Sequence, residues 1–237
     1  LNAALLTDVD ALWRVRNNAA RFSSLQLPGL FSPLGVRAYS DFTAVVLEKP
    51  ECTPLLNSVP GQAAAAIVAL QPVLEKIADT CDAIAAAHLP GANLQASDIW
   101  LQAPASDLST AQPKLFPRFL SSREAPNLSK TASSDDVGST VTSEMFTSAE
   151  HADDMRAQFG RLIYRIAAGR NCPAAASLAS QAYVAVPNLS EQANRTLALV
   201  IARKREYPTC RALLQDLRRS EGSTTMTSSY ASSPRAS

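Results

Sequence analysis

The side chains that could do chemistry in this chain are few and widely spaced. Asp98 directly precedes a short apolar run, and its carboxylate could hold a metal ion, although a lone Asp before a strand is also typical of a cap or turn. His88 ends an apolar segment, where it could act as a general base or have a purely structural role. The basic run Arg203-Lys204-Arg205 could bind an anionic partner, or it could be a solvated helix end that suits the helix dipole.

The composition argues against several classes of protein. The 237 residues include 22 Lys+Arg and 21 Asp+Glu, and this balance disfavours a nucleic-acid-binding protein that relies on positive charge. The four cysteines lie far apart without a C-x-x-C pair, so we expect a reducing compartment and no zinc site. We expect the chain to be cytoplasmic, or to lie on the cytoplasmic side of a membrane protein if an anchor precedes Leu1. No run of 18 apolar residues occurs, so no membrane span is expected. Because the chain starts at Leu1 rather than Met, we expect a processed or cropped chain.

The early part of the chain is predicted to combine one helix with short strands. Apolar residues recur near a 3.6-residue spacing from Asp8 to about Gln26, which predicts a helix ended by Pro28-Gly29. Short apolar runs predict strands at 34–36, 43–47, 99–101 and 114–116. Strands and helices do not alternate along the chain, so a doubly wound sheet is not expected.

The rest of the folded chain is predicted to be helical. Its longest candidate covers Gly61 to His88, and Pro72 is expected to break it, leaving Val73 to His88 as an amphipathic helix. Further helices are predicted at Met155–Ala168, Ser190–Arg203 and Thr209–Arg219, with Ser190 and Thr209 as N-caps.

Two segments are rich in serine and threonine. These residues make up 12 of the 28 positions from Ser121 to Ser148, and 10 of the 18 from Ser220 to Ser237. Neither segment has enough large apolar side chains to offset the entropy of ordering. We therefore expect a long mobile loop at 121–148 and a disordered tail at 220–237.

Five short strings, in order, resemble those of the protein-kinase family. Residues 27–36 follow H-P-N-I-V-x-L-L-G-V, residues 45–48 resemble the strand into the hinge, and residues 77–88 resemble the helix ending A-L-x-Y-L-H. Residues 159–170 resemble F-G-x-x-L-Y-E-L-L-T-G-x of the central helix, and residues 207–214 resemble R-P-T-x-x-x-L-L. The resemblance spans roughly Ala19 to Arg219. It implies an α+β, protein-kinase-like fold with a truncated N-terminal lobe at 1–50 and a helical C-terminal lobe at 51–219.

The residues that the family uses for catalysis are altered in this chain. Asn93 to Leu101 aligns with D-L-K-P-x-N-I-L-L, which puts Asn93 at the catalytic base position, and an amide cannot accept the proton. Gln95 takes the position of the lysine near the γ-phosphate. Asp98 takes that of the magnesium-binding Asn, where it could still hold a metal ion.

The second metal-binding position is also altered. Lys114 to Phe119 aligns with K-L-x-D-F-G and places Pro117 where the metal-binding Asp belongs; proline offers neither a side-chain ligand nor a backbone N–H. The glutamate of the A-P-E string corresponds to Glu144. Its usual arginine partner is replaced by Tyr207, with Arg205 as a substitute.

Other family positions are missing or displaced. The Asp that anchors the catalytic loop falls near Met155, with Asp154 one residue early, and Ala20 lies near the position of the glutamate that pairs with the nucleotide-binding lysine. The glycine-rich loop and that lysine would precede Leu1. The hinge alignment implies that Leu47, Glu48 and Lys49 could bind adenine through backbone groups.

The resemblance implies a pseudokinase that binds a protein partner, a kinase or a substrate, as a regulatory or scaffolding module. Two alternatives remain open. One is an active protein kinase whose glycine loop and lysine lie upstream, with ATP and Mg²⁺ as cofactors. The other is a helical interaction scaffold that shares only the order of elements with the family.

Overall fold

The computed structural model describes residues 9–39, 43–48, 51–57, 63–102, 108–120, 154–177 and 179–227. The loop predicted at 121–148, including Glu144, lies outside the described residues, as do Lys49 and the last ten residues of the predicted tail.

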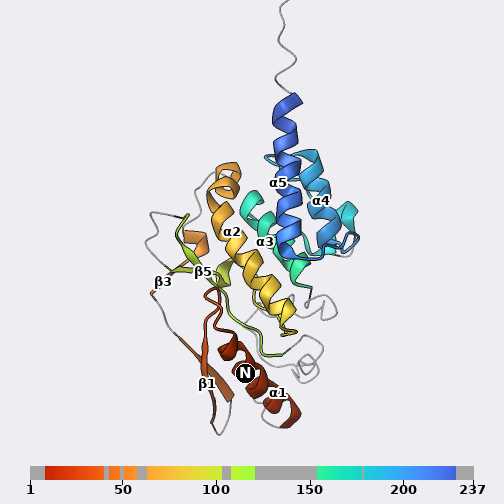
Figure 1. The fold of residues 1–237 in the computed structure, drawn as a ribbon. Helices are drawn as coiled ribbons and strands as arrows, with labels where there is room; N and C mark the ends of the chain where they lie inside the picture. Colours follow the sequence, from red (N-terminus) through yellow and green to blue (C-terminus); the bar gives the residue numbers. More distant parts are fainter. Residues whose placement is uncertain are drawn as a thin grey trace, which may run out of the picture.

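One helix and an antiparallel pair of strands form the N-terminal end of the molecule (Figure 1). α1 (Val9–Leu25) confirms the predicted helix and buries the stripe Val15, Ala19 and Phe22. β1 (Pro33–Ala38) pairs with β2 (Thr43–Leu47), with Val36 opposite Val45. Both predicted strands are confirmed, and β1 is longer than predicted.

A second, three-stranded antiparallel sheet lies beside the longest helix (Figure 1). Its strands are β3 (Cys52–Pro54), β4 (Trp100–Gln102) and β5 (Gln112–Lys114), in that order. The sequence did not predict β3, and β5 ends two residues earlier than predicted. The reason is that the backbone of Leu115 pairs with Gly29 and Phe31 instead of continuing the sheet.

In the described part of the chain, four α-helices make up most of the remainder: α2 (Ala63–Ala86), α3 (Met155–Ala168), α4 (Glu191–Ile201) and α5 (Cys210–Thr227). Both predicted N-caps are confirmed. The Ser190 hydroxyl accepts a hydrogen bond from the Ala193 N–H at 3.1 Å, and the Thr209 hydroxyl accepts one from the Ala212 N–H at 3.0 Å. α3 ends at Gly169, whose φ of 66° suits a residue without a side chain.

Pro72 lies inside α2, so the prediction that it breaks the helix is wrong. The buried stripe of α2 continues across the proline, with Leu70 before it and Val73 and Leu74 after it. Burial of large aliphatic side chains along one helix face outweighs the single hydrogen bond that proline removes.

α5 continues to Thr227, so its predicted end at Arg219 is eight residues too early. Two contacts extend it. The Ser220 hydroxyl donates to the Asp216 carbonyl at 2.9 Å, and the Glu221 carboxylate accepts a hydrogen bond from the Ser190 N–H of the neighbouring helix at 2.8 Å. A Ser/Thr-rich composition did not reveal these tertiary partners.

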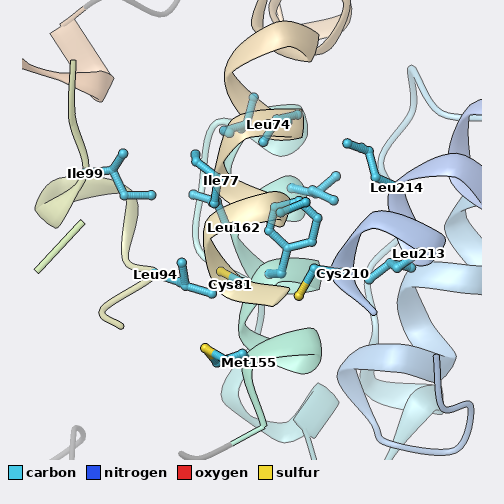
Figure 2. Packing of buried hydrophobic residues seen from close by; sticks show 14 of the residues in the cluster. Leu74, Ile77, Cys81, Leu94, Ile99, Met155, Leu162, Cys210, Leu213 and Leu214 are labelled. Atoms are coloured by element: carbon cyan, nitrogen blue, oxygen red, sulfur yellow. The ribbon is translucent and has the colours of Figure 1, made fainter. Parts of the chain in front are cut away.

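The hydrophobic core lies where α2, α3 and α5 meet. Figure 2 shows Cys81 of α2 near Cys210 of α5, and both belong to the buried cluster. The largest fully buried side chains include Tyr164 and Phe159 of α3, which makes this helix the centre of the core. Among the described residues, no helix is both long and apolar enough to cross a bilayer.

Candidate functional site

The loop between α2 and β4 begins with two residues of unusual backbone conformation. His88 ends the α2 segment with a φ of 51° and is exposed, so its ring is not enclosed in a pocket. Gly91 has a φ of 118°, a region that other residues rarely adopt. A side chain there would also meet Met155 at 3.5 Å. Met155, at the anchor position of the central helix, therefore lies close to this loop.

Asn93 and Asp98 face each other across the loop. The Asn93 Nδ2 donates to the Asp98 Oδ2 at 2.6 Å, and the Ser97 hydroxyl donates to the other carboxylate oxygen at 3.2 Å. Both side chains are half-buried. The 2.6 Å bond is a short charge-assisted hydrogen bond, which is a strong kind. Both carboxylate oxygens of Asp98 thus have partners within the loop.

Gln95 and the other side chains near this loop supply few further groups that could bind a metal ion. Gln95 is exposed, and its carbonyl accepts a hydrogen bond from the Asp98 N–H at 2.9 Å. Within the described segments, no group of three or more His, Cys, Asp or Glu side chains could hold a metal ion. Asp98, with the Asn93 amide oxygen beside it, is the carboxylate of this loop that could contribute to a metal site.

The segment after β5 runs alongside this loop. The Asn93 N–H donates to the Phe116 carbonyl at 2.8 Å, and the Arg118 N–H donates to the Gly91 carbonyl at 2.9 Å. Between these bonds lies Pro117, which is buried and forms a bridge with Ala92. The structure therefore brings Asn93, Asp98 and Pro117 together, with an apolar ring at the third position.

Lys114 and Glu48 form an ion pair that the sequence did not predict. The Lys114 ammonium lies 2.7 Å from the Glu48 carboxylate and donates to the Leu30 carbonyl at 3.2 Å. The hydrogen bond from Lys114 holds the pKa of Glu48 below its ordinary value of 4.5. The Glu48 N–H also donates to the Ser32 carbonyl at 2.9 Å. The hinge segment, including Leu47 at the end of β2, is thus tied to both β5 and the α1–β1 link.

α1 contributes a buried amide to the same region. Asn18 is 8% exposed, and its Nδ2 donates to the Phe119 carbonyl at 2.9 Å. The Phe119 ring packs edge-on against Phe22, one turn further along α1. Ala20, near the position that the resemblance implies for the lysine-pairing glutamate, is exposed. An asparagine within the apolar stripe Val15, Ala19 and Phe22 is the signal that could have indicated Asn18.

The remaining family positions have local structural roles. Asp154 caps α3 by accepting the Arg156 N–H at 3.0 Å. Arg205 pairs with Asp216 at 3.0 Å and lies 4.9 Å from the centre of the Tyr207 ring, whose hydroxyl also bonds to Asp216. Burial raises the pKa of Tyr207 to about 12. Arg205, the substitute for the family's arginine, thus pairs with Asp216 of α5.

This arrangement of elements is that of the protein-kinase-like fold. The chain resembles crystal structures of the kinase domain of Mycobacterium tuberculosis PknI. One singly substituted form has a TM-score of 0.61 and 14% identity, over 93% of this chain and 82% of that chain. An unsubstituted form gives a TM-score of 0.58 and 13% identity, over 93% and 83%. Identity at this level shows the fold alone. No family model matches the chain, and no curated protein matches it either.

Proposed function

We propose that this chain is a pseudokinase: a kinase-like domain that does not transfer phosphate and acts by binding a protein partner. The observation that carries the proposal is the Asn93–Asp98 hydrogen bond beside the buried Pro117. An amide stands where a base must accept a proton, and a ring without ligand atoms stands where a second carboxylate must hold magnesium. Loss of proton transfer alone lowers a rate by about 10²–10⁴-fold, and loss of the metal adds to that.

The hinge supports the same proposal. The resemblance implies that adenine would bind backbone groups of the hinge, but the Glu48 N–H already donates to the Ser32 carbonyl at 2.9 Å. We expect ATP to bind weakly or not at all, whether or not Mg²⁺ is present. Asp98 remains the residue that we would assign to any residual metal binding.

Exposed apolar side chains on the N-terminal end are consistent with a protein partner. Val9 and Trp13 lie one turn apart on α1 and are 76% and 65% exposed, and Leu34 on β1 is 69% exposed. Val9 and Trp13 share one face of α1, and large apolar groups that lie together on a surface are typical of interaction sites. The four cysteines are free thiols, which fits a reducing, cytoplasmic setting.

Phosphate release from ATP, with and without Mg²⁺, tests the proposal on the whole chain and on Asp98→Ala. We expect both proteins to show the same background rate. Mg²⁺-dependent turnover that Asp98→Ala abolishes would instead show that Asp98 supports phosphoryl transfer chemistry and would contradict the proposal. Fluorescence titration with an ATP analogue, measured in parallel, separates nucleotide binding from transfer.

The partner-binding part needs its own measurement. Sedimentation of the chain with a candidate kinase, compared with Trp13→Ala and with Leu56→Ala as a control for an exposed apolar residue elsewhere, would locate the contact surface. We expect Trp13→Ala alone to weaken the complex. Equal weakening by both variants would contradict the assignment to α1.

A further inference from the structure

A cavity of about 200 Å³ lies among four helices of the C-terminal part. None of its lining residues belongs to the loop with Asn93 and Asp98, and the proposed pseudokinase function does not involve it. Its aliphatic lining comes from α2, α3, α4, α5 and the segment before α4: Leu74, Ile163, Leu189, Leu197, Leu214 and Leu217. Figure 2 shows Leu214 of α5 extending toward α2, which carries Leu74.

Most of the aliphatic lining side chains are buried, whereas Leu189 is half-buried and Arg218 is exposed. Leu197 is 0% exposed, Leu74 is 1% exposed and Leu214 is 4% exposed. The space is partly open to solvent, and its aliphatic lining offers water few polar partners. An aliphatic cavity of about 150 Å³ in another protein stays dry and binds benzene. The space here is therefore suited to an apolar molecule of benzene size or slightly larger.

The charges at the mouth already have partners. Glu75 lies 2.8 Å from Arg218 and 3.4 Å from Arg211, and the Glu221 carboxylate accepts the Ser190 N–H. The Gln71 amide also donates to Glu75 at 3.1 Å. Both arginines near the mouth already pair with Glu75, so a ligand carboxylate would meet an acidic side chain beside each of them. The mouth thus favours a ligand without net charge.

We propose that this cavity is a binding site for a small neutral apolar molecule, aromatic or aliphatic. Such a ligand would fill the space between α2 and α4–α5 and hold these helices together. The site is independent of the proposed pseudokinase function, so either proposal can fail without the other.

Benzene and benzoate form the direct test, because they share a ring and differ by one carboxylate. NMR spectra of the methyl-labelled chain are recorded during titration with each. We expect benzene to shift the methyl signals of the cavity leucines and Ile163, and to leave that of exposed Leu34 unchanged. Benzoate should bind about tenfold more weakly or worse, because burying a charge is costly.

Ala193→Leu provides the matched variant. Ala193 lines the cavity and is 1% exposed, so a leucine there fills the space; Ala198→Leu makes the same change on the same helix at a half-buried position outside the lining. We expect benzene to raise the melting temperature of the wild type and of Ala198→Leu but not of Ala193→Leu.

Absence of cavity methyl shifts at saturating benzene would overturn the proposal, as would unchanged binding to Ala193→Leu. Tighter binding of benzoate than of benzene would overturn the assignment to a neutral ligand. Leu217→Phe offers a second filling variant if Ala193→Leu does not fold, and the methyl shifts of the wild type decide the matter without either variant.

Discussion

Asn93 and Asp98 carry between them one negative charge and one hydrogen bond, and this bond fixes the geometry of the candidate site. The carboxylate receives donors from Asn93 and Ser97. The loop is therefore stable with a single carboxylate, whereas metal-dependent phosphoryl transfer requires more acidic ligands and a base.

Asn93→Asp should make the stability of the protein depend on pH. Two carboxylates at the 2.6 Å separation of the present bond cannot both ionise freely, so the introduced carboxyl group has a folded-state pKa above its unfolded value. The variant should be close to wild type at low pH. It should lose stability as pH rises from the unfolded-state pKa of this group to its raised folded-state pKa, by about 1–3 kcal/mol at pH 8. Urea unfolding between about pH 4 and pH 8 measures this.

Gln95→Glu is the control for that variant, because it adds the same charge to an exposed position of the same loop. It should show little pH dependence of its own. Identical profiles for the two variants would mean that Asn93 and Asp98 are not in contact.

The Lys114–Glu48 pair should be worth more than an exposed ion pair. The Lys114 side chain is only 10% exposed, so Glu48→Gln leaves a nearly buried ammonium with the Leu30 carbonyl as acceptor. We expect a loss of about 1–3 kcal/mol, with part of it recovered in the double variant Glu48→Gln/Lys114→Met. Urea unfolding of the two single variants and the double variant measures the coupling, and strictly additive losses would contradict it.

The same pair has a defined pH window. Lys114 lowers the pKa of Glu48 below 4.5, so the pair stabilises the protein above that pH. Its contribution is lost as pH falls through the lowered folded-state pKa. Lys114→Met should remove this part of the acid sensitivity.

At the scale of elements, one carboxylate joins two helices that are distant in sequence. Asp82 of α2 accepts hydrogen bonds from the Cys210 N–H at 2.7 Å and the Arg211 N–H at 3.1 Å, at the first residues of α5. These N–H groups have no partner within their own helix, and the positive end of the helix dipole favours a carboxylate. Asp82 therefore fixes the position of α5 on α2.

Asp82→Ala should destabilise the protein by about 1–2 kcal/mol and speed hydrogen exchange in the first turn of α5. Asp79→Ala is the matched control: it lies on the same helix but is 63% exposed and pairs with Arg211. Its cost should stay below about 1 kcal/mol. Urea unfolding and hydrogen exchange measure both, and equal losses would show that Asp82 does not act as a cap.

At the scale of the whole molecule, the described N-terminal helix and strands contact the rest of the chain mostly along β5 and the segment that follows it. Leu115 exchanges backbone hydrogen bonds with Gly29 and Phe31, and the Phe31 ring stacks on that of Phe116 with centres 4.5 Å apart. Asn18 adds its hydrogen bond to Phe119. Local unfolding of the N-terminal part is thus expected to need less free energy than global unfolding.

Phe31→Ala should release this part selectively. Phe31 is 6% exposed, and truncation of a buried phenylalanine costs about 3–5 kcal/mol. We expect faster hydrogen exchange in α1, β1 and β2, with little change in α3 to α5. Leu34→Ala, at an exposed position of β1, should change little. Uniform acceleration across all helices would instead indicate one cooperative unit.

The sequence by itself determined the helices, the two N-terminal strands and the identity of the side chains at the family positions. Helices follow from local periodicity and caps: α3 has the predicted bounds, and Ser190 and Thr209 cap as expected. The order of these elements carried enough resemblance to indicate the protein-kinase-like fold.

Only the tertiary structure decided the contacts between distant segments. Pro72 remains helical because the buried face of α2 continues across it, and α5 extends past Arg219 because Glu221 meets the N-terminus of α4. Asn18 lies 101 residues from its partner Phe119. Lys114 lies 66 residues from its partner Glu48. No local pattern encodes such pairs, since burial and partner choice are set by packing of the whole chain.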